Sequence, residues 1–146
     1  MSSKNSMLSA LTVLLIAGVT WIGGCVTETP NQEALTQVTK NIAPQEAFTL
    51  IQENQNNPDF VILDVRTPEE FADGHIANSI NVDFYSETFR DDINKLDKDK
   101  TYLIYCRSGN RSGKALNIMV GLGFMEAYNI SGGIIEWKAE GLPIIK

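Results

Sequence analysis

The chain has 146 residues, enough for one domain of ordinary size and a short additional segment. Hydrophobic residues make up 43% of the chain and charged residues 21%, which is typical of a globular protein and excludes general disorder. The formal net charge is −6 and no basic cluster opposes it, so we expect no nucleic-acid partner.

The first 25 residues are typical of an export signal. Lys4 gives a weakly positive start, and residues 7–22 form an uncharged apolar run that is shorter than the roughly twenty residues of a spanning helix. The run ends in Ile22-Gly23-Gly24-Cys25, which resembles the lipobox of bacterial lipoproteins, with Ile22 where Leu is usual. The resemblance implies cleavage before Cys25 and attachment of lipid to Cys25; an uncleaved membrane anchor is the alternative.

The resulting division of the chain is a signal peptide over residues 1–24, a polar lipid-anchored tether over 25–37 and a folded domain over 38–146. We therefore expect the domain to lie in the cell envelope, outside the cytosol and bound to a membrane through Cys25. In a cell with two membranes, we expect the periplasmic face of the outer one.

From residue 38 onward, short apolar runs alternate with segments of helical spacing. This alternation predicts a parallel sheet with helices on both faces. The predicted strands are 38–42, 60–65, 80–82, 101–105 and 127–130, and the predicted helices begin at Pro44 and Pro68 and cover 85–96, 110–122 and 134–139.

Charged residues follow the second predicted strand, at the edge where open α/β sheets place their sites. Asp64 and Arg66 stand at the end of that strand, and Arg66 is expected to reach Glu70 in the next short helix. His75 is the only histidine and could act as a general base. A thiolate held by arginines and backbone amides needs no such base, so we assign His75 a structural role.

The segment from Cys106 to Ser112 joins the fourth strand to the following helix and is suited to anion chemistry. Backbone N–H groups in such a loop can turn inward, and the helix N-terminus adds partial positive charge. Arg107 and Arg111 add two full charges. A cysteine at this place could be an inert buried residue, but two cations and a loop glycine favour a reactive thiolate with a lowered pKa.

Three stretches of the sequence, in order and spacing, resemble the rhodanese family of sulfurtransferases. They are LDVRTPEEFADGHI at residues 63–76, CRSGNRS at 106–112 and GGIIEWKAEGLP at 132–143, and together they cover about residues 38–145. The resemblance implies a rhodanese-like α/β fold, with a mostly parallel open sheet of about five strands flanked by helices on both faces. One departure follows His75, where Ala77-Asn78-Ser79 replaces the common Pro-Gly-Ala.

The resemblance also implies roles for individual residues. Cys106 would be the catalytic nucleophile, and Asp64, Arg66 and Glu70 would support the active loop. The loop residues Arg107, Ser108, Gly109, Asn110 and Arg111 would bind the substrate, with anchoring of the loop as the alternative role for Arg111.

The expected reaction is transfer of sulfane sulfur from thiosulfate or another persulfide donor to a thiol acceptor, through a persulfide on Cys106. The partners would be a small anionic sulfur donor and a thiol or thioredoxin-like acceptor, and we expect a monomer without a cofactor. One histidine and one remaining free cysteine make no ligand cluster, so we expect no metal site.

Two other functions are compatible with a Cys-to-Arg loop on this fold. Thiol phosphatases and arsenate reductases use a related loop, but that of the phosphatases sharing the rhodanese fold is one residue longer than the four residues between Cys106 and Arg111. A non-catalytic rhodanese-like binding module is the other alternative, and it would be favoured if Cys106 had been replaced.

Overall fold

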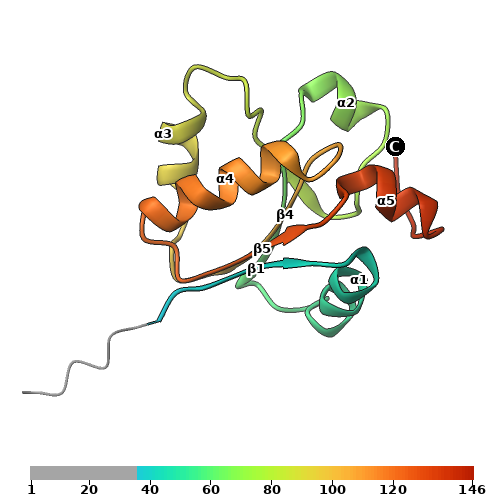
Figure 1. Ribbon diagram of the computed structural model, residues 1–146, viewed down its shortest axis with the longest axis horizontal. Helices are drawn as coiled ribbons and strands as arrows, with labels where there is room; N and C mark the ends of the chain where they lie inside the picture. The colour runs from blue at the N-terminus through green and yellow to red at the C-terminus, as the bar shows by residue number, and fades with distance from the viewer. Residues whose placement is uncertain (1–35) are drawn as a thin grey trace, which may run out of the picture. The chain divides into compact units, whose positions relative to one another are not determined.

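A computed structural model describes residues 36–146, so the predicted signal peptide, Cys25 and nearly all of the predicted tether lie outside the described residues. The described part contains one five-stranded sheet in which every pair of neighbouring strands is parallel (Figure 1). The sheet order is β1-β5-β4-β2-β3, so the strand that leads to Cys106, β4, lies at the centre. The strands are β1 (Val38–Ile42), β2 (Phe60–Asp64), β3 (Ser79–Asn81), β4 (Thr101–Tyr105) and β5 (Glu126–Ile130).

Five helices alternate with the strands, as the sequence pattern predicts. They are α1 (Pro44–Glu53), α2 (Pro68–Ala72), α3 (Phe89–Asn94), α4 (Asn110–Gly121) and α5 (Gly133–Ala139). Pro44 and Pro68 each occupy the first turn of a helix, where the missing N–H costs nothing. None of the helices in residues 36–146 has the length and apolar content needed to cross a bilayer.

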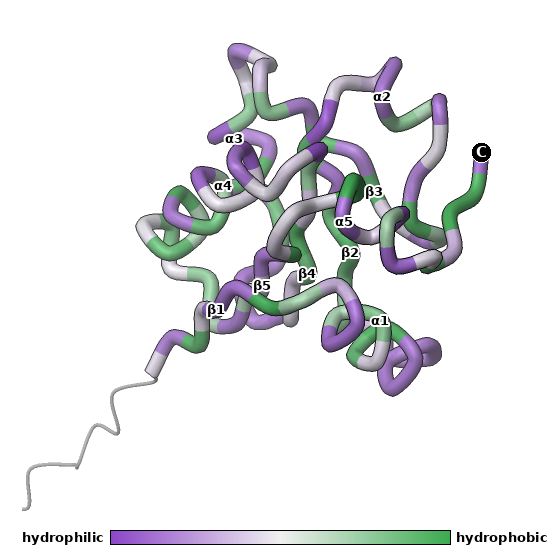
Figure 2. The backbone as a smooth tube through the Cα atoms, turned by 45° about the vertical axis from the view of Figure 1, so that its right-hand side comes forward, coloured by the Kyte–Doolittle hydropathy of each residue, from purple (hydrophilic) through white to green (hydrophobic). Residues whose placement is uncertain are grey.

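Alternating side chains of the central strands supply two separate cores, one on each face of the sheet. Tyr102 and Ile104 of β4 pack in the core under α3 and α4, whereas Leu103 and Tyr105 pack in the core under α1 and α5. In Figure 2 the central strands β2 and β4 are the most apolar, as expected for strands covered on both faces. The predicted fold class, a parallel sheet with helices on both faces, is therefore confirmed.

Trp137 lies in the core under α1 and α5 and is 1% exposed. Its indole N–H donates to the carbonyl of Pro143 at 2.9 Å, which satisfies the one polar atom of the ring. The residues on either side of Pro143, Leu142 and Ile144, pack against the same core.

The predicted helix over residues 85–96 is wrong in its first turn, because α3 begins only at Phe89. Asp83 accepts the backbone N–H of Tyr85 at 2.9 Å, and the Ser86 hydroxyl accepts the N–H of Thr88 at 3.2 Å. Such side-chain bonds to nearby backbone favour turns over helix. The result places Tyr85 on an exposed turn instead of a helix face.

The departure at Ala77-Asn78-Ser79 has a structural counterpart. Asn78 has a φ of 63°, in the left-handed region, and it is the only residue other than glycine there in the described part of the chain. Asparagine tolerates this conformation better than most residues, so it can take the place that glycine commonly has in the resembled sequences.

Candidate active site

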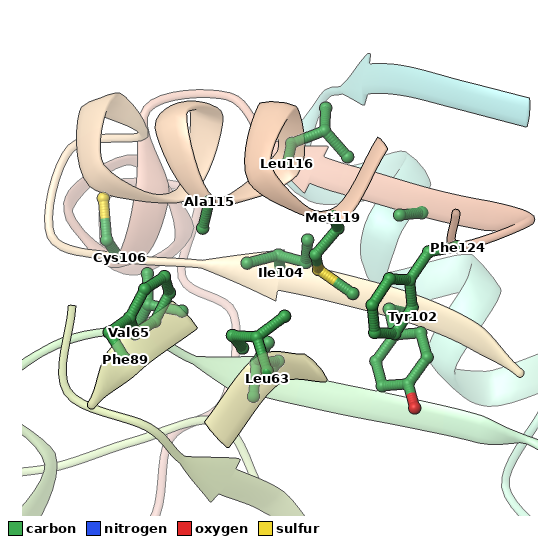
Figure 3. Close-up of a cluster of buried hydrophobic side chains, with 12 residues drawn as sticks. Leu63, Val65, Phe89, Tyr102, Ile104, Cys106, Ala115, Leu116, Met119 and Phe124 are labelled. Carbon is green, nitrogen blue, oxygen red and sulfur yellow. The ribbon is translucent and has the colours of Figure 1, made fainter. Parts of the chain in front are cut away.

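The Cys106 loop lies at the carboxyl end of β4, between that strand and the first turn of α4. Cys106 is 1% exposed and lies at one end of the core under α3 and α4. Figure 3 shows its sulfur directed toward the start of α4. Gly109 has a φ of 85°, which a residue with a side chain adopts only with strain, and it turns the chain from the loop into the helix. The loop thus folds around the thiol.

Two hydrogen bonds to the sulfur atom define the chemistry of the site. The backbone N–H of Gly109 donates to Cys106 Sγ at 3.2 Å, and the buried hydroxyl of Ser112 donates at 3.3 Å. Burial by itself raises the pKa of the Cys106 thiol. The Ser112 hydroxyl and the backbone N–H groups of Ser112, Ser108 and Gly109 outweigh burial, so the net pKa is lowered.

The lowered pKa agrees with the sequence prediction, which named inward-turned backbone N–H groups, the helix N-terminus and the two arginines. The groups that bond to the sulfur are neutral: a backbone N–H, as predicted, and the hydroxyl of Ser112. Ser112 was not among the predicted site residues. The sequence places Ser112 in the first turn of the predicted helix, close to the cysteine loop. Only the fold shows that its hydroxyl points back toward Cys106.

Arg111 is held by Glu70 and does not extend freely over the loop. Its Nη1 and Nη2 atoms donate to the two carboxylate oxygens of Glu70 at 2.7 and 2.8 Å. This bidentate pair lowers the pKa of Glu70 and raises that of Arg111. The guanidinium carbon also lies 5.3 Å from the centre of the Tyr85 ring, so one charged group is fixed from two sides.

The expected contact between Arg66 and Glu70 is not formed. Arg66 instead pairs with Asp64, at 2.6 Å, and donates to the carbonyl of Gly74 at 2.8 Å. Both members of that pair are buried. Asp64 and Arg66 therefore brace the end of β2 against the next loop, while Glu70 is left to bind Arg111.

A capping box at the start of α2 holds Glu70 in place. The hydroxyl of Thr67 accepts the N–H of Glu70, and the Glu70 carboxylate accepts the N–H of Thr67. The same carboxylate therefore closes the first turn of α2 and anchors Arg111, a residue 41 positions further along the chain.

The start of α5 contacts the Cys106 loop from the other side. The N–H groups of Ile134 and Ile135 donate to the carbonyls of Cys106 and Arg107 at 2.9 and 3.1 Å. A Cβ on Gly133 would overlap the Cys106 carbonyl oxygen and approach the Arg107 carbonyl carbon to 2.7 Å. Gly133 thus permits the close approach that joins α5 to the loop.

His75 contacts groups away from the thiol. Its Nδ1 lies 3.0 Å from the carbonyl of Phe71, its ring stacks on the Phe71 ring at 3.8 Å, and its backbone bonds to Ile145. These contacts support the structural role predicted for it. Within residues 36–146, no three His, Cys, Asp or Glu side chains gather in a way that could hold a metal ion.

A pocket of about 530 Å³ opens over the loop. Arg107 is exposed at its edge, and no described side chain pairs with its guanidinium. The pocket can therefore attract a small anion to Arg107 and to the exposed backbone of the loop. Its lining consists of Glu70, Tyr85, Arg107, Ser108, Asn110 and Arg111.

Comparison with known proteins agrees with this geometry. Residues 48–140 match the family described as the rhodanese-like domain. A sulfurtransferase of Allochromatium vinosum is 35% identical over 97 residues, which cover 66% of this chain and 89% of that protein. The tRNA uridine(34) hydroxylase of Pectobacterium atrosepticum is 38% identical over 99 residues, but this chain spans only 27% of its length.

Solved structures give the same result. A rhodanese-related protein from Thermoplasma volcanium is 34% identical, with a TM-score of 0.60 over 73% of this chain and 97% of that one. A rhodanese-like domain protein from Staphylococcus aureus is also 34% identical, with a TM-score of 0.58 and coverage of 73% and 99%. Because the family match covers most of the folded part and the sheet and the cysteine loop agree with it, the chain belongs to the rhodanese family.

Proposed function

We propose that the protein is a sulfurtransferase that carries sulfane sulfur from thiosulfate, or a related persulfide donor, to a thiol acceptor through a persulfide on Cys106. The observation that carries the proposal is the pair of hydrogen bonds from Gly109 and Ser112 to the Cys106 sulfur. A buried thiol that is merely structural gains nothing from such donors, whereas a thiolate nucleophile depends on them. The similarity to a sulfurtransferase over 89% of that relative's length points the same way.

In the first half-reaction, the Cys106 thiolate attacks the outer sulfur of thiosulfate. A new bond forms between the two sulfurs, the S–S bond of thiosulfate breaks, and sulfite leaves with the electron pair. Arg107 and the loop N–H groups would bind the anionic donor and the departing sulfite. The acceptor thiolate then attacks the outer sulfur of the persulfide, and the Cys106 thiolate is regenerated.

Arg111 bears on the choice between sulfur and phosphoryl transfer. In the phosphatase reading, this arginine would have to be free to hold a phosphate. Here its guanidinium is bound to both oxygens of Glu70, and the loop is one residue short. Both features favour the smaller reacting centre at sulfur.

The activity test compares thiosulfate sulfurtransferase with aryl-phosphatase turnover in the same preparation. We expect the first to be measurable and the second negligible. Cys106→Ser should abolish transfer because a hydroxyl cannot carry the persulfide. Arg107→Ala should reduce kcat/KM roughly ten- to a hundredfold, since one charge-assisted contact contributes about 1.5–3 kcal/mol.

Each negative result has a definite meaning in this test. Full transfer by Cys106→Ser would refute the mechanism. Phosphatase turnover above sulfurtransferase turnover would favour the phosphatase reading. No turnover of either kind by a folded wild-type protein would favour a non-catalytic binding module.

We further propose that lipid on Cys25 holds the domain on a membrane, outside the cytosol. The support is the sequence that ends in Gly24-Cys25. Cys25→Ala should block processing in the native host and leave the precursor uncleaved on an immunoblot. A mature protein whose N-terminus is any residue other than Cys25 would contradict this proposal.

A further inference from the structure

A second, smaller hollow adjoins the pocket over the Cys106 loop. It has a volume of about 190 Å³ and shares two of its walls, Glu70 and Arg107, with the larger pocket. Its remaining residues come from the segment after β2, from the C-terminal end of α2 and from α5, and both helices lie on the right of Figure 1. The two hollows therefore adjoin at Glu70 and at Arg107, the residue that follows the nucleophile.

The floor of this second hollow is fixed to the nucleophile. Ile134 and Ile135 line it, and their N–H groups are bonded to the carbonyls of Cys106 and Arg107 at 2.9 and 3.1 Å. A molecule seated there is therefore held at a set position relative to the Cys106 loop. Ile135 is 49% exposed, which gives the hollow an apolar side that a short hydrocarbon chain can cover.

The charges of the second hollow fall into a paired and an unpaired set. Arg66 is paired with Asp64, and Glu70 is paired with Arg111. The side-chain charges of the other three, Arg107, Lys138 and Asp73, are exposed and form no ion pair with another described residue. The hollow therefore offers two cations and one carboxylate that are free to bind a ligand.

These unpaired charges complement a small molecule that carries both a carboxylate and an ammonium group. A carboxylate would bind to Arg107 and Lys138, and an ammonium to Asp73. The net charge of the whole protein is −6, which repels anions at long range, so an anionic group is retained only where local cations outweigh that field. This hollow is such a place.

Building on the proposed function, we propose that the second hollow is the acceptor subsite and that its ligand is a low-molecular-weight thiol with an amino-acid group, such as cysteine or a short peptide with cysteine at an end. The donor anion would occupy the larger pocket. The acceptor thiolate attacks the outer sulfur of the Cys106 persulfide, a sulfur–sulfur bond forms on the acceptor, and the bond to Cys106 Sγ breaks. The electron pair returns to Cys106, and the thiol proton goes to solvent.

The kinetic test uses four small thiols: cysteine, which carries a carboxylate and an ammonium group, 3-mercaptopropionate, which carries only the carboxylate, cysteamine, which carries only the ammonium group, and 2-mercaptoethanol, which carries neither. Lys138→Gln should lower kcat/KM about three- to fivefold for the two that carry a carboxylate and leave the other two unchanged. Asp73→Asn should instead lower it for the two that carry an ammonium group. Because each variant is compared with wild type on the same acceptor, differences in intrinsic thiol reactivity cancel.

Three controls separate a subsite from a general charge effect. Lys138→Arg should retain the wild-type pattern, since the charge is kept. Lys95→Gln removes the same charge just beyond α3, outside both hollows, and should leave all four acceptors unchanged. Formation of the persulfide from thiosulfate should be equal in Lys138→Gln and wild type. Equal losses for all acceptors, or a loss in persulfide formation, would overturn the proposal.

A binding test keeps this proposal distinct from the proposed function. S-methylcysteine has the amino-acid group but no free thiol, and it should slow alkylation of Cys106 by iodoacetamide in wild type and much less in Lys138→Gln. This readout does not require sulfur transfer. Protection of Cys106 without sulfur transfer would support the acceptor subsite and refute the sulfurtransferase function. Sulfur transfer without protection would support the sulfurtransferase function and refute the acceptor subsite.

Discussion

Ser112→Ala tests how the site stabilises the thiolate. The substitution removes one O–H donor at 3.3 Å from Cys106 Sγ and leaves the Gly109 N–H in place. Ser112 is 0% exposed, so water cannot easily replace the lost donor. Hydrogen bonds to charged groups contribute about 1.5–3 kcal/mol, and sulfur is a weak acceptor, so we take about 1.5 kcal/mol.

This free energy corresponds to roughly a tenfold fall in the thiolate fraction at a pH well below the thiol pKa. The direction follows from the sign of the effect: the Ser112 hydroxyl lowers the pKa of Cys106, so its removal raises that pKa. The assay is the rate of Cys106 alkylation by iodoacetamide as a function of pH. The midpoint should move upward, and the rate at pH values well below the midpoint should fall by about tenfold.

Ser131→Ala is the matched control, since Ser131 is an exposed serine just after β5 and should leave the alkylation profile unchanged. Urea unfolding of both variants shows whether the fold is intact. An unchanged midpoint in a folded Ser112→Ala protein would refute the role given to the Ser112 hydroxyl. The backbone N–H groups of the loop and the two arginines would then be left to stabilise the thiolate.

Two further predictions concern the supports of the loop. Glu70→Gln should lower the free energy of unfolding by about 1 kcal/mol at neutral pH. The difference from wild type should vanish on acidification, because a carboxylate with a lowered pKa loses its stabilising effect as the pH falls through that pKa. A difference that persists well below pH 4.5 would contradict this. Gly133→Ala should cost about 3 kcal/mol or more through overlap with the loop carbonyls, whereas Gly141→Ala, with a φ of 72° and nothing within 4 Å, should cost about 1–2 kcal/mol in urea unfolding. Equal costs would show that the close approach is unimportant.

The parts of the fold that are set by local sequence could be predicted. The continuous apolar runs of β2 and β4 and the prolines that begin α1 and α2 are signals within a few residues. The first turn expected for α3 was wrong, because Asp83 and Ser86 bond to nearby backbone instead. The spacing of hydrophobic residues gives no information on this competition between side-chain bonds to the backbone and helical hydrogen bonds.

Contacts between distant residues of the site could not be predicted from spacing alone. Arg66 and Glu70 are near in sequence and were expected to meet, yet Glu70 pairs with Arg111, 41 positions away. The choice depends on how α2 and the start of α4 lie at the same edge of the sheet. Ser112 was missed because its hydroxyl reaches back from the first turn of α4 across the loop to Cys106, a contact that depends on how the loop folds.

The central claim is that Cys106 carries sulfur, and mass spectrometry of the purified domain after thiosulfate treatment tests it most directly. We predict one added sulfur atom on the peptide that contains Cys106, removed again by an acceptor thiol and absent in Cys106→Ser. Sulfur found elsewhere on the chain, or no added sulfur on a Cys106 shown to be reduced and reactive toward iodoacetamide, would contradict the claim.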